Sequence, residues 1–193
     1  MKYFLPFILL LNFNLLISQN QFKVEFDVGY AFQGDTKINN ESLGVTDALG
    51  LRLGINYQKA LYKKIFFEAG LFSKYNRSKN TIENLTFISN SLKLQLPIYI
   101  SYKLNKNWDL SLGVSIENNK DFSDFELSRE YNMRYDFLTK IVYNYTKKLS
   151  FSFYTNWAVS ELPDYYTISS PKNGIYFGVA YNLFTIKNKN NEE

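Results

Sequence analysis

The stretch at residues 92–117, LKLQLPIYISYKLNKNWDLSLGVSIE, decides the fold. In its first half, large apolar residues alternate with Lys, Gln, Pro, Tyr and Ser, and from Trp108 onward the alternation returns after a short polar turn. A period of two residues is typical of a β-strand with one apolar and one polar face. The stretch therefore predicts an antiparallel hairpin. Pro97, which cannot donate a backbone hydrogen bond, predicts a bulge or bend within it.

The same alternation extends over most of the chain. It is found at residues 22–33, 49–58, 65–74, 92–103, 108–117, 133–144, 149–157 and 175–183. Alternating segments of about ten residues are the sequence signature of transmembrane barrels, and several together are stronger evidence than one. The prediction is an all-β fold, an eight-stranded antiparallel up-and-down transmembrane β-barrel.

The joints between these segments alternate in length. Four are long and polar, at 34–44, 77–87, 118–130 and 160–173. The three between them are tight, at 59–64, 105–107 and 146–148. Outer-membrane barrels have short periplasmic turns at one rim and longer extracellular loops at the other. The joints therefore predict that arrangement.

Alternation alone leaves open whether the apolar face points outward to lipid or inward to a soluble core. Tyr and Trp residues gather at the predicted strand ends, where an aromatic belt would meet lipid headgroups. The polar face carries nearly balanced charges, which a narrow lumen could hold as ion pairs. We therefore expect lipid outside. The expected interior polar network is Glu25, Asp27, Arg52, Glu68, Lys93, Asp109, Arg134, Asp136 and Lys140.

The first eighteen residues form a separate segment. A basic residue precedes an apolar run that Pro and Asn interrupt, and Ser18 ends it. This is the layout of a secretory signal peptide, whereas a membrane-spanning helix needs about 20 consecutive apolar residues. The expected division is a signal peptide at 1–18, a barrel at 19–186 and a polar tail at 187–193.

Three pieces of the chain resemble one family. They are LKLQLPIYISYKL with the following NKNWDLSLGVSI, FEAGLFSKYN at 67–76, and GIYFGVAYNLF at 174–184. They are similar to strands of the PorT-like outer-membrane β-barrel proteins of Bacteroidetes, small barrels of the OmpA type. The resemblance covers most of the mature chain in layout and is specific in these pieces. It implies the barrel fold and an outer-membrane location.

The chain has no histidine and no cysteine. Their absence removes the commonest general base, thiol nucleophiles and the commonest zinc ligands, so we expect no enzyme, no metal site and no cofactor. Glu25 and Asp27 lie two residues apart on one face and leave acid–base chemistry formally open, although pairing with interior Lys and Arg is favoured. A scattered net charge of +4 does not indicate nucleic acid.

These observations predict a non-enzymatic integral protein of the Gram-negative outer membrane, whose barrel anchors long extracellular loops. Loop residues expected to contact a partner are Phe122, Phe125, Tyr165 and Tyr166. Two alternatives stay open. A narrow ion or solute channel predicts conductance that depends on the charged lumen residues, and a secreted lipocalin-like barrel predicts apolar residues inside around a small ligand.

Overall fold

The computed structural model describes seven stretches of the chain. They are residues 20–33, 37–38, 41–42, 45–82, 85–121, 132–159 and 173–186. The expected signal peptide and polar tail lie outside the described residues, as do Phe122, Phe125, Tyr165 and Tyr166. Within the described stretches, no helix is long and apolar enough to cross a membrane.

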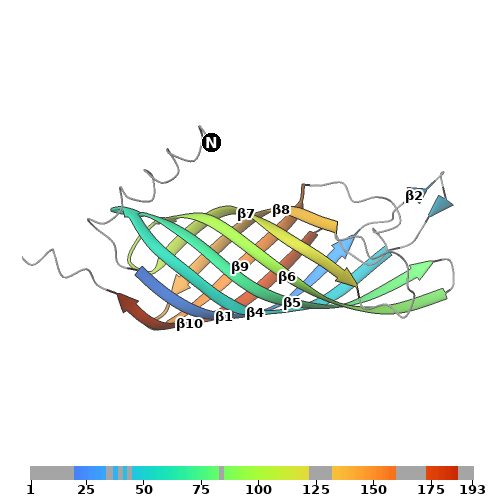
Figure 1. The fold of residues 1–193 in the computed structure, drawn as a ribbon, viewed down its shortest axis with the longest axis horizontal. Helices are drawn as coiled ribbons and strands as arrows, with labels where there is room; N and C mark the ends of the chain where they lie inside the picture. Colours follow the sequence, from blue (N-terminus) through green and yellow to red (C-terminus); the bar gives the residue numbers. More distant parts are fainter. Residues whose placement is uncertain are drawn as a thin grey trace, which may run out of the picture.

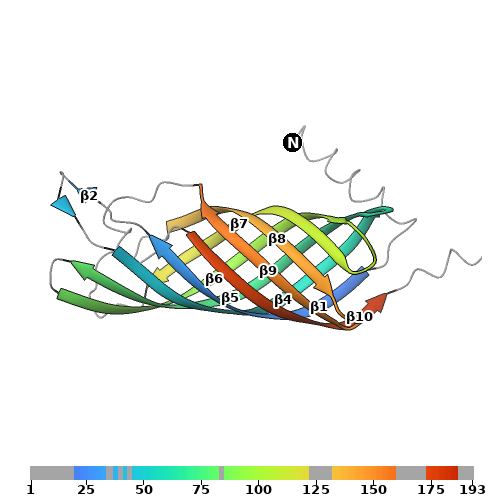
Figure 2. The same cartoon turned by 180° about the vertical axis from the view of Figure 1, so that it is seen from behind.

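Eight long strands close into one barrel (Figures 1 and 2). Each strand runs antiparallel to both neighbours, and the first strand closes the circle against the last. The strands are β1 (Asn20–Gln33), β4 (Val45–Tyr62), β5 (Ile65–Ile82), β6 (Leu85–Lys103), β7 (Trp108–Asp121), β8 (Asn132–Asn144), β9 (Leu149–Ala158) and β10 (Asn173–Ile186). The predicted closed, eight-stranded antiparallel barrel is confirmed. Two short strands, β2 (Lys37–Ile38) and β3 (Glu41–Ser42), pair within the joint that was predicted as a loop.

The two ends of the barrel differ. At one end, which we call the turn rim, β4–β5, β6–β7 and β8–β9 are joined by tight turns, and β1 begins beside the end of β10. The opposite end, the loop rim, carries the paired ends of β5 and β6, which project beyond the other strands of the barrel (Figures 1 and 2). The short turns therefore lie at one rim, and the strand ends that lead into the long joints lie at the other.

The extent of β5 and β6 differs from the prediction. Residues 77–87 were predicted as a long joint, but they continue β5 and β6 in paired register, from Arg77 opposite Asn90 to Ile82 opposite Leu85. The prediction was wrong because apolar alternation fades near Tyr75, whereas a strand ladder needs only backbone groups. For the same reason β7 runs to residue 121, into a predicted joint, and β4 runs to residue 62 before its turn.

Of the bulge or bend predicted at Pro97, the bulge is wrong. Pro97 pairs with Ser115 of β7 in unbroken register. The ladder with β5 keeps one register on either side of the proline, with Ile98 opposite Ala69 and Gln95 opposite Phe72. Proline removes a hydrogen-bond donor but adds no residue, so the strand continues without a shift. Register shifts occur instead near the turn rim, in β1 against β10 and in β4 against β5.

Candidate functional site

The barrel wall has two chemically opposite faces. Inward side chains are mostly polar or charged and buried in the lumen, and outward side chains are mostly apolar and exposed. On β7, Leu112 and Val114 are 51% and 54% exposed, while Ser111 and Ser115, which flank them, are at most 1% exposed. We call these faces the lumen and the outer wall. All nine residues of the predicted interior network lie in the lumen and are buried.

Arg52 of β4 is the centre of the first lumen cluster. Its Nε donates to Asp27 Oδ2 at 2.6 Å, its Nη1 donates to Gln95 Oε1 at 3.1 Å, and its Nη2 lies 3.4 Å from Glu25 Oε1. The planar guanidinium thus contacts three acceptor residues, which belong to two other strands. Arg52 contacts both Glu25 and Asp27, and Lys140 Nζ lies 3.9 Å from Glu25 Oε2, so the two carboxylates pair with an interior arginine and lysine.

The guanidinium of Arg52 is also sandwiched by rings. Its Cζ atom lies 4.0 Å from the ring centroid of Phe72 and 4.2 Å from that of Tyr154. Tyr154 in turn stacks on Tyr176, with ring centroids 4.6 Å apart and planes 6° apart. Cation–π contacts of this kind are strongest where water is excluded. The buried Tyr99, Phe72, Tyr154 and Tyr176 rings therefore fill the middle of the lumen with the arginine held among them.

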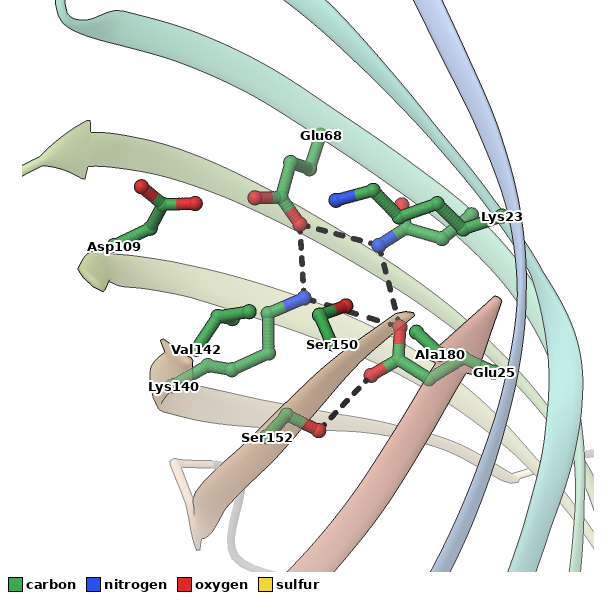
Figure 3. Close-up of a pocket in the computed structure, with 10 residues that line it drawn as sticks. Lys23, Glu25, Glu68, Asp109, Lys140, Val142, Ser150, Ser152 and Ala180 are labelled. Carbon is green, nitrogen blue, oxygen red and sulfur yellow. Dashed lines mark hydrogen bonds and ion pairs between the residues drawn. The ribbon is translucent and has the colours of Figure 1, made fainter. Parts of the chain in front are cut away.

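Glu68 of β5 centres a second cluster towards the turn rim (Figure 3). Lys140 Nζ donates to Glu68 Oε2 at 2.8 Å and lies 3.9 Å from Glu25 Oε2, so it bridges two carboxylates. Asn56 Nδ2 donates to Glu68 at 3.1 Å, and the Ser101 hydroxyl also donates to it. Gln58 Nε2 is a third neutral donor to Glu68, at 3.2 Å, so one lysine and three neutral side chains hold this carboxylate.

A small cavity opens beside this cluster. It has a volume of about 10 Å³, and Lys23, Glu25, Glu68, Asp109 and Lys140 are among the residues that line it. Asp109 is held by a hydrogen bond of 2.8 Å from Asn144 Nδ2. A polar space of this size holds about one water molecule, which is too small for an organic ligand.

A third cluster lies towards the loop rim. Glu117 of β7 accepts a hydrogen bond of 3.1 Å from Lys74 Nζ and has Lys93 Nζ 3.5 Å away. Beside it, Arg134 Nε donates to Asp136 Oδ1 at 2.6 Å, and Asn156 donates to the same carboxylate at 3.3 Å. Among the described residues the lumen buries as many acidic as basic side chains. They are Glu25, Asp27, Glu68, Asp109, Glu117 and Asp136 against Lys23, Arg52, Lys74, Lys93, Arg134 and Lys140.

Several buried lumen residues lie outside the predicted interior network of nine residues. Lys74 and Glu117 form a buried ion pair, and Phe72, Leu138 and Tyr176 are buried large side chains of the lumen. The signal that could have identified Phe72 and Leu138 was strand parity, because each lies two residues from a lumen cation, Lys74 and Lys140. Their apolar character concealed them, since apolar residues were assigned to the outer wall.

Glycine allows close approach at one point of the lumen. A Cβ atom built on Gly178 of β10 would overlap Asp27 Oδ1 and Ser152 Oγ. Gly178 pairs directly with Asp27 across the β1–β10 closure. The missing side chain is therefore what lets the Asp27 carboxylate reach Arg52.

The outer wall is bordered by aromatic residues with polar atoms. Near the turn rim these are Tyr57, Tyr62, Tyr102, Trp108, Tyr143 and Tyr145, all exposed or half-buried. Near the loop rim, Tyr30, Tyr75 and Trp157 are exposed, and the Tyr75 hydroxyl donates to Asn90 Oδ1 at 2.7 Å. Tyr131 lies outside the described residues. Within the described stretches, no group of three or more acidic residues could hold a metal ion.

Comparisons with known proteins agree with the fold. No protein-family model and no curated protein matches the sequence. Among solved structures, Neisserial surface protein A matches at 15% identity over 84% of this chain and 97% of that chain, with a TM-score of 0.55. Ail, the attachment invasion locus protein of Yersinia pestis, solved with the heparin analogue sucrose octasulfate, matches at 10% identity over 86% and 99%, with a TM-score of 0.51. Both are small eight-stranded outer-membrane barrels, so the chain shares their fold.

Proposed function

We propose that this chain is an integral outer-membrane protein whose barrel spans the lipid bilayer. The observation that carries the proposal is the inversion of faces, with apolar side chains exposed around the barrel and a charge-balanced polar lumen. Soluble proteins rarely expose contiguous apolar patches larger than a few hundred Å², whereas lipid requires such a wall. The lipocalin-like alternative predicted apolar residues inside the barrel, which disagrees with the polar lumen.

The same proposal covers export and orientation. Residues 1–18 act as a cleaved signal peptide, residues 187–193 form a polar tail, and short turns face the periplasm while long joints face outward. Support comes from the layout of the first eighteen residues and from the opposite rims that the turns and joints occupy.

The barrel serves as a closed anchor and not as a pore. Support comes from the packed middle of the lumen, where Arg52 is sandwiched between Phe72 and Tyr154. Eight-stranded barrels have interiors just wide enough for side chains to fill. The protein is non-enzymatic and needs no cofactor, because His and Cys are lacking and the lumen carboxylates are engaged by cations and amides. Membership of the PorT-like family rests on the three sequence pieces alone.

The long joints carry the function in this proposal. Phe122, Phe125, Tyr165 and Tyr166 lie in two of them and are the candidates for contact with a protein in the membrane or outside the cell. Their support is their position in long joints of an exported barrel, where binding residues are commonly found.

Cell fractionation tests the location. The natively expressed protein should be recovered in the outer-membrane fraction and should migrate differently on a denaturing gel before and after boiling, because a folded barrel resists detergent. An inner-membrane protein and a soluble periplasmic protein, fractionated in parallel, serve as controls. Recovery in the soluble fraction without a gel shift would refute the proposal.

Cysteine labelling tests the orientation, and the natural absence of Cys makes single variants clean. Ser123→Cys in a long joint should react with a membrane-impermeant maleimide on intact cells. Lys147→Cys in a tight turn should react only after the outer membrane is permeabilised. The reverse pattern would contradict the orientation.

Conductance distinguishes the anchor from the channel. The purified barrel in planar bilayers should show no discrete openings, with an open porin as a positive control. Openings whose size changes in Arg52→Gln or Asp136→Asn would overturn the closed-anchor proposal in favour of a narrow channel.

A further inference from the structure

The turn rim carries an unusual concentration of one charge. Seven lysines lie in or beside its three turns and are exposed or half-buried: Lys59, Lys63, Lys64, Lys103, Lys106, Lys147 and Lys148. The acidic residues of the neighbouring strand ends that the structure describes, Glu25, Glu68 and Asp109, are buried in the lumen. The solvent-facing side of the rim is therefore uniformly basic in the described part of the chain. We call these seven residues the lysine rim.

The lysine rim is spread around the barrel. Lys63 and Lys64 form the β4–β5 turn, with Lys59 three residues before the end of β4. Lys106 lies in the β6–β7 turn, with Lys103 as the last residue of β6, and Lys147 and Lys148 lie in the β8–β9 turn. Going around the barrel, the β4–β5 turn is followed by the β6–β7 turn and then by the β8–β9 turn, so that the three turns cover six of the eight barrel strands. The charge thus follows most of the circumference instead of marking one flank, as a docking patch for a single globular partner would.

Each turn also places its lysines beside an aromatic residue of the outer wall. Tyr62 precedes Lys63 and is 63% exposed, and Lys63 Nζ lies 5.4 Å from the centroid of its ring. Trp108 follows the second turn, and Tyr145, also 63% exposed, precedes the third. Tyr and Trp prefer the level of the lipid headgroups. Long lysine side chains next to them reach the same level with their charged ends.

The loop rim is different. Its outward basic residues on β5, Arg77 and Lys79, follow the end of the apolar run, but Lys79 pairs directly with Asp47 of β4. Described residues of mixed sign therefore face outward there, and the single-sign ring is a property of the turn rim.

We propose that the lysine rim binds the anionic headgroups of phospholipids in the leaflet that surrounds the turns. The groups recognised are phosphodiester oxygens of lipids with net negative charge, which attract ammonium groups within about a Debye length of the surface. A ring at headgroup level contacts the lipid shell on most sides of the barrel, which favours lipid over an acidic protein. This inference rests on the proposed membrane insertion.

Lipid selectivity tests the inference. The full barrel is reconstituted in phosphatidylcholine vesicles, and spin-labelled phosphatidylglycerol and phosphatidylcholine report how strongly each lipid associates with the protein. The wild type should favour phosphatidylglycerol by about fivefold at low salt, which is the attraction expected of about one lysine near an anionic surface. The preference should fall towards one in high salt because ions screen the charges.

Two double variants provide matched controls. Lys147→Gln with Lys148→Gln removes two charges from the lysine rim and should reduce the preference for phosphatidylglycerol measurably. Arg77→Gln with Lys79→Gln removes two charges from the loop rim and should reduce it less. Replacing all seven lysines by Gln should abolish it.

The gel shift on boiling is measured on every reconstituted sample, so that two failures are distinguishable. Loss of the shift in the wild type would mean that membrane insertion, and with it the proposed function, is wrong. A retained shift with no lipid preference, or an equal loss in both double variants, would overturn only the lysine-rim inference. So would binding of an acidic polypeptide to the rim in the absence of any lipid preference, because the partner would then be a protein.

Discussion

The lumen and the outer wall are formed by the same strands, but they place different demands on their side chains. In the lumen, specific partners must meet: Arg52 contacts acceptors that lie 25 and 43 residues away in the chain at 2.6 and 3.1 Å. On the outer wall, residues such as Leu112 and Phe177 are exposed and need only be apolar. The stability of the barrel should therefore respond to small changes of shape and pairing in the lumen, whereas on the outer wall it should respond mainly to added charge.

The largest effect should come from removing a lumen cation. Arg52→Ala leaves Asp27 buried without its arginine, and breaking a buried ion pair from one side costs about 3–5 kcal/mol. The free energy of unfolding in lipid vesicles, followed through the fluorescence of the two Trp residues during a urea titration, measures it. Arg77→Ala, which removes an exposed arginine, is the control and should change little. An equal loss of unfolding free energy in both variants would contradict the expected difference between the lumen and the surface.

A charge on the outer wall should have the next largest effect. Leu112 lies midway along the apolar run of β7, and Leu112→Arg places a guanidinium against lipid at a cost of about 2–4 kcal/mol. The same urea titration measures it. Leu112→Phe keeps the wall apolar and should be close to neutral. If the arginine were tolerated like phenylalanine, the outer wall would not face the hydrocarbon core.

Overpacking the lumen should cost somewhat less. Gly178→Val would press a side chain against the Asp27 carboxylate and Ser152, and extra volume in a packed interior costs about 1–3 kcal/mol. Val179→Ile is a smaller enlargement, of one methylene, at the neighbouring residue that faces outward, and it should stay within a few tenths of a kcal/mol because the outer wall needs only to be apolar. Equal costs in urea would contradict the proposed difference in packing between the faces.

The smallest effect should come from a polar pair on the outer wall. The hydroxyls of Thr139 and Thr155 are 2.7 Å apart, and the Trp157 Nε1 donates to Thr155 at 2.9 Å. Side-chain hydrogen bonds between membrane segments contribute about 0.6 kcal/mol on average. A double-mutant cycle with Thr139→Val and Thr155→Val should give a coupling energy of that size. A coupling of several kcal/mol would mean that the outer wall also depends on specific pairing.

Much of the fold could be predicted from the sequence because strand alternation is local. The period of two in 92–117 correctly assigned both strands, the turn between them and the side chains that face each way. The extent of β5 and β6 beyond Tyr75 could not be predicted, since backbone pairing continues where the side-chain pattern ends. Phe72 and Leu138 were missed because their apolar character assigned them to the outer wall. Their positions in the strand, two residues from lysines that face the lumen, place them inside.

The sequence could predict which charged residues line the lumen, but it could not predict which of them contact one another. The nine charged residues were assigned to the lumen because each occupies the polar face of its strand, and all nine are buried there. Which of them meet depends on barrel closure: Lys140 bridges Glu68 and Glu25, which lie 72 and 115 residues earlier in the chain. No local pattern encodes that contact.

The existence of the eight strands, their two faces and the alternation of short and long joints follow from the amino-acid sequence, because each depends on neighbours along the chain. The position of Arg52 between Phe72 and Tyr154 and the room that Gly178 leaves for Asp27 are visible in the folded barrel alone. These depend on closure and register, which bring distant strands to within a few ångströms. Local backbone geometry sets the direction of each side chain, whereas the closed circle of strands sets which side chains meet in the lumen.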